Sequence, residues 1–394
     1  MSYKILYISY DGMFEPLGQS QVLQYVTSLT KSYNHKFWLI SLEKPKHFSS
    51  KADVQNLKKI LYEQNIVWHP LEFSSAFFVF GGVLNLFKLI ALAFHLIRKN
   101  SIQLIHARSY IPAIVGFVMG RLLKTPFIFD MRGFWIDERV DTGKISKNSP
   151  VYYVGKIIEK ILLSSADHIV SLTQAAVYEM QKFSYLKSKT ASHFSVIPTC
   201  TDVDHFNLSS QPKTDFIVGY VGNATGWYNF DAACTSFITL KKIKPSARLL
   251  IVNEGQHDFI KSKLTEHQIL DYELTSSQHK SMVSLIQKMD IAIFFIRKLY
   301  SKTASMPTRL AEFLACGVPC ITGDGIGDVD EIIIKNKLGV VVNNHKFTEL
   351  DAKNALEIMS DPQTQERCRQ AAVRFFSLAE GVKKYQQIYS RLCN

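Results

Sequence analysis

Short apolar runs alternate with helical segments along almost the whole chain, and this alternation constrains the fold more than any single motif. Regular alternation of strand and helix predicts an α/β protein with parallel sheets. A chain of 394 residues exceeds the size at which one hydrophobic core stops growing, so we expect two domains joined by the polar segment 207–214. The runs that we predict as strands include 3–10, 37–41, 66–69, 101–107, 126–130, 168–172, 194–197, 216–221, 247–253, 290–296 and 318–322.

The composition is that of an ordinary globular protein, with 47% apolar and 20% charged residues. The six cysteines show no paired metal-ligand spacing, which is typical of a reduced cytoplasmic protein. No signal peptide is visible, because Lys4 leads directly into a strand-like run.

The 46 basic and 34 acidic residues give a net charge of +12. Three partners fit such a charge: nucleic acid, an anionic membrane surface or phosphorylated substrates. The basic residues are scattered and no nucleic-acid-binding module is visible, so we predict no nucleic acid partner. We favour a membrane surface together with diphosphate substrates.

Residues 76–97 form the most apolar segment, in which Lys88 is the only charged residue. We predict an amphipathic helix, because the polar positions share one narrow face at the helical period: Asn85, Lys88 and His95. The segment is long enough to span a bilayer, but we expect Gly81-Gly82 to break it and the next strand to return to the same sheet. Two interpretations stay open. The helix is buried between sheet and surface, or it dips into a membrane with Arg98 and Lys99 at the headgroups, as Phe77, Phe78 and Phe80 favour.

The stretch 290–333 predicts an anion-binding site. A strand over 290–296 and a loop over 297–305 precede a helix over 307–316, in which Pro307 suits the first helical position. Ser305 is well placed to cap this helix, and Gly317 to close it in the left-handed conformation. The free N–H groups of the helix start face a loop that carries Arg297 and Lys302, and such a site favours a diphosphate.

Glu312 lies inside the predicted helix among apolar neighbours. A carboxylate in such a place must accept hydrogen bonds, which sugar hydroxyl groups could supply. The structural alternatives are a surface glutamate or an ion pair with Arg309, three residues earlier. The whole stretch favours a ligand site.

Residues 305–319 resemble the donor-site signature of the family 4 (group 1) retaining glycosyltransferases, which have the GT-B fold. The resemblance implies two Rossmann-like domains whose parallel sheets face a central cleft. The family signature has two glutamates with seven residues between them; Glu312 matches the second, which holds the donor ribose, and Ala304 stands at the first. A subgroup with Lys-x-x-Ser-x-Pro ahead of the helix is matched by Lys302, Ser305 and Pro307.

A second charged cluster follows the strand that ends at Asp130. Five charged groups, with Phe134 and Trp135, gather over 130–139 beyond the carboxyl end of a strand, where ligands bind in open α/β sheets. The structural alternative is an ion pair between Asp130 and Arg132. In the family a histidine near this place contacts the reacting sugar, and here Arg132 stands at about that position. The candidate catalytic residues are Asp130, Arg132 and Glu138, and the choice between Asp130 and Arg132 stays open.

Three other segments complete the predicted donor site. We predict a helix over 20–31, and Gly18 lies just ahead of its start. A glycine in such a place permits close approach of the backbone to a ligand. The resemblance implies that this N-terminal loop and the loop from Gly222 approach the donor phosphates. Most members place arginine and lysine in the second loop, so their role falls here to Arg297 and Lys302. The residues that we add to the donor site are Gly18, Gln19, Gly222, Asn223 and, beside the base, Thr275.

The resemblance also implies the domain plan and the reaction. We predict an N-terminal acceptor domain (1–206), the linker (207–214), a C-terminal donor domain (215–376) and a last helix (377–394) that returns to the first domain. The reaction would move a sugar from a UDP- or GDP-linked donor to a hydroxyl of a saccharide or lipid-linked saccharide, without cofactor or metal. Bacterial surface polysaccharide or lipopolysaccharide assembly at the inner face of the cytoplasmic membrane fits this chemistry. The alternatives are a sugar-nucleotide epimerase on the same fold and a catalytically silent GT-B binding protein.

Overall fold

The computed structural model describes residues 2–74, 80–209, 213, 215–277 and 281–394. The chain divides into two compact units. The N-terminal unit comprises 1–136, 145–197 and 378–394, and the C-terminal unit comprises 137–144 and 198–377. The division falls after Ile197, whereas we had placed a domain boundary at residue 206, and it groups 137–144 with the second unit.

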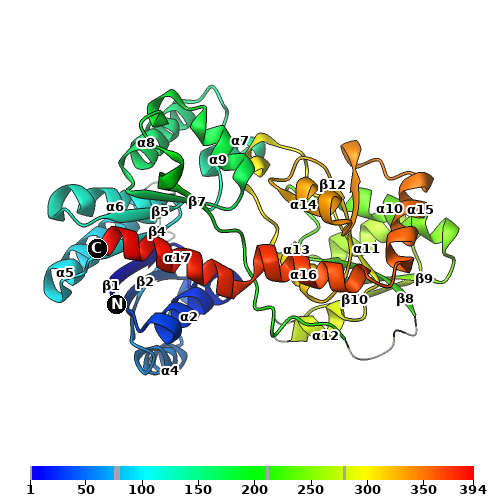
Figure 1. The fold of residues 1–394 in the computed structure, drawn as a ribbon, viewed down its shortest axis with the longest axis horizontal. Helices are drawn as coiled ribbons and strands as arrows, with labels where there is room; N and C mark the ends of the chain where they lie inside the picture. The colour runs from blue at the N-terminus through cyan, green and yellow to red at the C-terminus, as the bar shows by residue number, and fades with distance from the viewer. Residues whose placement is uncertain (1, 75–79, 210–212, 214, 278–280) are drawn as a thin grey trace. The chain divides into compact units, whose positions relative to one another are not determined.

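The N-terminal unit is built on a seven-stranded parallel sheet with the order β3-β2-β1-β4-β5-β6-β7. Figure 1 labels β1, β2, β4, β5 and β7 of this sheet. The strands are largely buried apolar runs, as expected for a sheet covered on both faces. Their bounds are β1 Lys4–Ser9, β2 Lys36–Glu43, β3 Ile66–Glu72, β4 Leu104–Arg108, β5 Phe127–Asp130, β6 His168–Ser171 and β7 Phe194–Val196.

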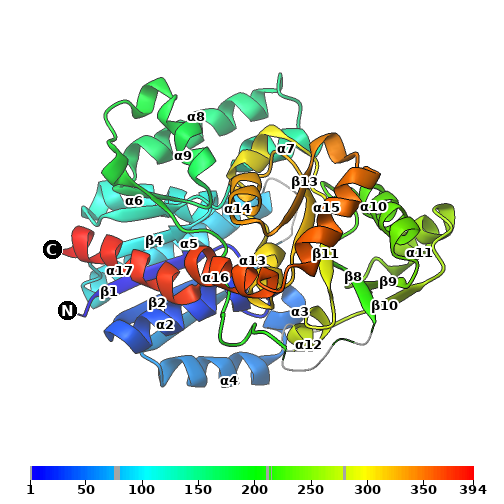
Figure 2. The ribbon, with the colours of Figure 1, turned by 45° about the vertical axis from the view of Figure 1, so that its right-hand side comes forward.

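Helices cover the two faces of this sheet. The chain moves along the sheet in one direction from β1 to β3 and in the other from β4 to β7, so right-handed crossovers place α2 and α4 on one face and α5, α6 and α8 on the other. The last helix, α17, packs beside α2 (Figure 2). The helices are α1 Pro16–Gly18, η1 Gln19–Leu23, α2 Gln24–Tyr33, α3 Pro45–Phe48, α4 Lys51–Tyr62, α5 Phe80–Asn100, α6 Tyr110–Leu123, α8 Pro150–Ser165, α9 Gln174–Gln181, η2 Ser184–Leu186, η3 Ala191–His193 and α17 Leu378–Cys393. Helix α7 Trp135–Asp141 begins in this unit, and its residues from Asp137 belong to the C-terminal unit.

The C-terminal unit is built on a six-stranded parallel sheet with the order β10-β9-β8-β11-β12-β13. The prediction of an α/β protein with two parallel sheets is therefore confirmed. The strands are β8 Phe216–Val221, β9 Ala247–Val252, β10 Tyr272–Thr275, β11 Ile291–Phe294, β12 Cys320–Gly323 and β13 Gly339–Val342. The helices are α10 Phe230–Ile243, α11 His257–Glu266, α12 Met282–Ile286, η5 Tyr300–Ala304, α13 Thr308–Ala315, α14 Val329–Asn336, η6 Asn343–His345, α15 Glu349–Ser360 and α16 Thr364–Phe376.

The most apolar helix differs from its prediction. Helix α5 begins at Phe80 and continues through Gly81-Gly82, so the predicted break is wrong. Both glycines lie in the first turn, ahead of the interior positions at which glycine is most unfavourable. The burial of Leu89, Ala93 and Leu96 stabilises the helix. Residues 76–79 of the predicted segment lie outside the described ranges, as do 210–212 and 214 of the predicted linker. Nowhere in the described chain is a helix both long and apolar enough to cross a bilayer.

Candidate functional site

The predicted site residues fall into two groups, one in each compact unit. In the N-terminal unit, parallel register aligns three strand ends: Ser9 of β1 lies beside Arg108 of β4, and Arg108 lies beside Asp130 of β5. Polar side chains therefore meet at the carboxyl edge of the sheet, where open α/β sheets bind ligands. Arg108 and Asp11 form an ion pair there, with 3.5 Å between Nη1 and Oδ2.

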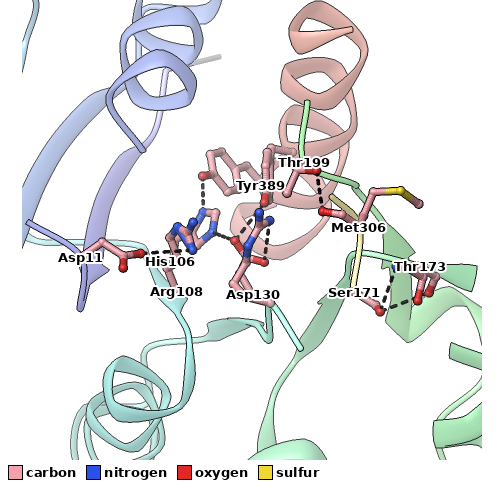
Figure 3. A network of polar contacts seen from close by, with 11 residues as sticks. Asp11, His106, Arg108, Asp130, Ser171, Thr173, Thr199, Met306 and Tyr389 are labelled. Atoms are coloured by element: carbon pink, nitrogen blue, oxygen red, sulfur yellow. Dashed lines mark hydrogen bonds and ion pairs between the residues drawn. The ribbon is translucent and has the colours of Figure 1, made fainter. Parts of the chain in front are cut away.

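His106 joins this edge of the sheet to the last helix (Figure 3). Its Nδ1 lies 2.6 Å from the hydroxyl oxygen of Tyr389, and its Nε2 lies 3.5 Å from Oδ2 of Asp130. A charged carboxylate only accepts hydrogen bonds, so Nε2–H donates to Asp130 and Nδ1 accepts from Tyr389. Burial lowers the pKa of His106, against the raising effect of Asp130, and this favours the neutral ring.

Asp130 is a buried carboxylate with three partners. Tyr385 of α17 donates a hydrogen bond to Oδ2 at 3.0 Å, and Nη1 of Arg132 lies 3.6 Å from Oδ1. Burial alone would raise the pKa of Asp130, but Arg132 and His106 outweigh burial and hold the pKa far below its usual value. Arg132 is held in the left-handed region with a φ of 62°, which is uncommon for a residue with a side chain. The structural alternative that we had considered, a pair between Asp130 and Arg132, is therefore present.

Gly18 does not lie in a loop ahead of a helix, as we had predicted. The helical segment begins at Pro16, which occupies the first turn, and Gly18 is buried within it. A Cβ at Gly18 would lie 1.9 Å from the carbonyl oxygen of Gly12, so the close approach is to the protein's own backbone. Gln19 follows as an exposed side chain.

Lys302 is the central cation of the second group. It lies in η5 and is only 3% exposed. Its Nζ lies 2.9 Å from Oε1 of Glu138 and 3.9 Å from the ring centroid of Trp227, a close cation–π contact. Trp227 reaches this place because its carbonyl accepts a hydrogen bond from the Arg297 amide at 2.8 Å.

Segment 137–144 holds η5 through two carboxylates. Glu138 pairs with Lys302, and Oδ2 of Asp141 accepts a hydrogen bond from the Ser301 amide at 2.9 Å. The charged cluster predicted over 130–139 is divided by the structure, because from Trp135 the chain forms helix α7. Glu138 therefore belongs to the C-terminal unit, whereas Asp130 and Arg132 belong to the N-terminal unit.

Helix α13 begins one residue later than predicted. Pro307 is its N-cap with extended backbone (ψ 124°), not its first helical residue, and its carbonyl accepts from the Leu310 amide at 3.2 Å. Ser305 does not cap this helix, because it ends η5 and donates its amide to the Lys302 carbonyl. Gly317 has a φ of 74°, the left-handed conformation that we had predicted.

Glu312 is 1% exposed and forms an ion pair with Arg309 of the same helix. This is the structural alternative of the sequence prediction. The pair engages Oε2 of Glu312, and the side chain of Arg309 is 34% exposed, so its guanidinium reaches the surface. A ligand that displaces Arg309 would gain access to a buried carboxylate.

The other predicted donor residues lie in the C-terminal unit. Arg297 and Asn223 are exposed. Gly222 has a φ of 124°, which favours glycine, and its amide donates to the Val252 carbonyl at 3.0 Å. Thr275 ends β10, and its carbonyl accepts from the Asn253 amide at 3.0 Å.

One cluster of metal-ligating groups occurs among the described residues, and sequence inspection had missed it. Ligand atoms of Asp231, Glu266 and His267 lie within 4.8 Å of one another. Nζ of Lys263 lies 3.1 Å from Asp231 and 3.0 Å from Glu266, so one ammonium already pairs with both carboxylates and balances one of their two charges. These groups belong to α10 and the end of α11, not to the site around Lys302.

Sequence reasoning missed four residues that hold these groups. Trp227 lies in the loop from Gly222, and His106 lies in the strand predicted over 101–107, but neither was singled out. Tyr385 and Tyr389 lie in the predicted last helix and were not singled out either. The available signals were the position of His106 at a strand end and two tyrosines four residues apart on one helix face.

Known proteins resemble this chain in sequence and in fold. Residues 204–375 match the family described as glycosyl transferases group 1. The chain is 19% identical to an uncharacterized glycosyltransferase of Methanocaldococcus jannaschii, over 99% of this chain and 100% of the relative. It is similar to sucrose-phosphate synthase from Thermosynechococcus elongatus (TM-score 0.73, 15% identity, 99% of each chain) and to Anabaena HepE in complex with UDP and glucose (TM-score 0.70, 14% identity, 99% of this chain and 100% of HepE). These likenesses show the GT-B fold that the sequence resemblance had implied.

Proposed function

Residues 204–375 belong to the group 1 glycosyl transferase family, and from that premise we propose that the whole chain is a retaining glycosyltransferase. It moves a sugar from a UDP- or GDP-linked donor to a hydroxyl group of a lipid-linked saccharide. The complex of Anabaena HepE with UDP and glucose supports a nucleotide-sugar donor for this fold.

The observation that carries the proposal is the buried ammonium group of Lys302. An ammonium that is 3% exposed is expensive to bury unless an anion compensates it. Glu138 supplies that anion, and its side chain is 32% exposed, so it can leave without opening the core. A donor diphosphate that replaced Glu138 would pair with the same Lys302 ammonium. The ammonium would then stabilise the negative charge that develops on the leaving diphosphate, without a metal.

Glu312 and Arg297 complete the proposed donor site. Glu312 would bind the ribose hydroxyl groups once Arg309 moves aside, and the exposed Arg297 would pair with a phosphate. Ala304, at the position of the family's first glutamate, is a buried methyl group and offers the sugar no acceptor. The sugar hydroxyl groups would therefore be held by other groups than in most relatives.

In the N-terminal unit, we assign contact with the reacting sugar or the acceptor to Arg132 and a positioning role to Asp130. The low pKa of Asp130 makes it a weak base, and Tyr385, His106 and Arg132 already surround it. Asp130 instead fixes the guanidinium of Arg132, whose side chain is 12% exposed against 2% for Asp130.

The charge of the chain supports the proposed acceptor class. A net charge of +12 suits an anionic membrane surface that carries a lipid-linked saccharide, as in polysaccharide or lipopolysaccharide assembly. In this proposal the enzyme works at the inner face of a cytoplasmic membrane as a peripheral protein.

Donor hydrolysis tests the proposal. The chain is incubated with a panel of UDP- and GDP-linked sugars, and released diphosphate and free sugar are measured together with the anomer formed first. We expect release from one donor with retention of configuration, and thermal stabilisation by the matching diphosphate. An isomerised sugar nucleotide without release of diphosphate would show an epimerase. Absence of both turnover and stabilisation would show a silent binding protein.

A further inference from the structure

One face of the N-terminal unit exposes apolar side chains in a concentration found nowhere else among the described residues. Helices α5, α6 and α8 hold 51 of the 394 residues, yet they carry ten of the twenty large apolar side chains that are exposed. A contiguous apolar area on a protein surface marks an interaction site more often than chance exposure does. We call this area the three-helix face.

The exposed stripe of α5 is opposite its buried stripe. Leu89, Ala93, Leu96 and Ile97 are buried against the unit. Phe87 is 66% exposed, Leu84 50% and Phe94 44%. At the helical period these three share one side, so the helix is apolar on both its inner and its outer surface. The polar face that we had predicted is divided, because Asn85 is buried and bonds the backbone of Ser74.

Helix α8 repeats this arrangement. Its inner residues Leu162 and Leu163 are buried, while Val151, Val154, Ile157 and Ile161 are between 40% and 61% exposed. These four recur at helical spacing and form one outer stripe. Helix α6 lies between the two, since it packs against both α5 and α8. Its exposed Leu122 and the half-buried Phe117 add to the same face.

The charges on the three-helix face have one sign. Exposed cations lie along it and at its ends: Lys88, Arg98, Lys99, Arg121 and Lys160. The only acidic residue in the three helices is Glu159, which is buried and bonded to Tyr110 and Lys156. An apolar surface edged by cations without exposed acids matches the boundary between acyl chains and anionic headgroups.

We infer that the three-helix face docks the chain on an anionic lipid surface, with α5 and α8 lying in the plane of that surface. Phe87, Phe94 and Ile157 enter the acyl boundary, and the cations contact lipid phosphates. A second copy of the chain fits the face less well, because a two-fold contact would set cations against cations. The inference adds a surface to the proposed function, and it stands on the exposure and charge of the helices alone.

Vesicle binding of the full chain tests this assignment. Vesicles of phosphatidylcholine mixed with phosphatidylglycerol are sedimented with the protein and compared with vesicles of phosphatidylcholine alone. We expect binding to the mixed vesicles that weakens with added salt, because exposed charges are screened. The Phe87→Glu and Ile157→Glu variants are each expected to bind about tenfold more weakly, since an acid replaces an inserted apolar group.

Leu270→Glu is the matched control. Leu270 is 87% exposed in the C-terminal unit, and the substitution changes hydrophobicity and charge in the same way. We expect it to bind vesicles as the unchanged chain does, and all three variants to keep donor hydrolysis in solution. Equal vesicle binding by all variants, or no preference for phosphatidylglycerol, would overturn the inference. A dimer that Phe87→Glu dissociates, without vesicle binding, would assign the face to a second copy. If the unchanged chain binds the mixed vesicles but hydrolyses no donor, only the proposed function is refuted.

Discussion

Nζ of Lys302 lies 2.9 Å from Oε1 of Glu138, across 164 residues of sequence. A diphosphate that binds Lys302 must displace or share this carboxylate. We therefore predict that Glu138→Gln raises the affinity for UDP or GDP by about 3- to 10-fold, since it removes a competing charge whose pairing is worth about 1 kcal/mol. Isothermal titration of the unchanged and variant chains measures the effect.

The control for this prediction is Asp141→Asn. It makes the same change of charge one helical turn away, at a residue that bonds the Ser301 amide and not Lys302. An affinity gain in both variants would reflect net charge alone. A weaker diphosphate affinity in Glu138→Gln would show that Glu138 contacts the nucleotide or organises the site. An unchanged affinity with a lower turnover would make it a catalytic residue.

Glu312 and Lys302 are predicted to act on different parts of the donor. Glu312→Gln is expected to weaken UDP or GDP binding about tenfold, the worth of a hydrogen bond to a charged group, while pyrophosphate binding is unchanged. Lys302→Ala is expected to weaken the binding of UDP, GDP and pyrophosphate alike, because all three carry the diphosphate group. Competition assays with pyrophosphate and the nucleotides separate these effects. If Glu312→Gln weakens pyrophosphate binding as much as nucleotide binding, the result would count against a contact between Glu312 and the ribose.

The sheets could be predicted from sequence, whereas the partners of the charged residues could not. The strand predicted over 216–221 has the same bounds as β8, because an apolar run between Asp215 and Gly222 permits little else. The His106–Tyr389 bond joins residues 283 apart, and no periodicity carries such a pairing. Likewise, nothing in the Lys302 motif points to Glu138 as its partner.

Rules that read only neighbouring residues also could not fix where a helix begins to within one residue. Pro307 satisfies the first helical position and the N-cap equally well by pattern, and its observed ψ of 124° selects the cap. We had expected the space beside Gly18 to admit a ligand, whereas the carbonyl of Gly12 occupies that space. In both cases the deciding neighbour comes from the fold, not from the adjacent sequence.

Gly18 and Gly82 provide a test of that distinction. Gly18→Ala is expected to destabilise the chain by about 1–3 kcal/mol, because its Cβ would lie 1.9 Å from the Gly12 carbonyl oxygen and force the backbone apart. Gly82→Ala, in helix α5 with nothing within 4 Å of the new Cβ, is expected to stabilise it by about 0.5–1 kcal/mol. Thermal and urea unfolding of both variants measures the difference. Equal stabilities would show that the loop at Gly12 yields without cost.

The last helix is held by a histidine that must stay neutral. Arg391 of α17 donates a hydrogen bond to Nδ1 of His168, and Nε2 lies 2.9 Å from Oγ of Ser195. A guanidinium cannot accept, so Nδ1 carries no proton and Nε2–H donates to Ser195. Burial, together with the Arg391 charge, lowers the pKa of His168 from 6.5 to about 3.

This lowered pKa predicts a loss of stability in mild acid. Between pH 6.5 and about 3 the unfolded chain binds a proton at His168 that the folded chain does not, so the free energy of unfolding falls as pH falls. From pH 6.5 to about 5 the loss from this residue is about 2 kcal/mol. His168→Asn keeps an acceptor for Arg391 but does not titrate, so its urea unfolding curve should move less over this range. The exposed His95→Asn is the control and should follow the unchanged chain. Parallel curves for His168→Asn and the unchanged chain would mean that Arg391 swings away from His168 once the ring is protonated.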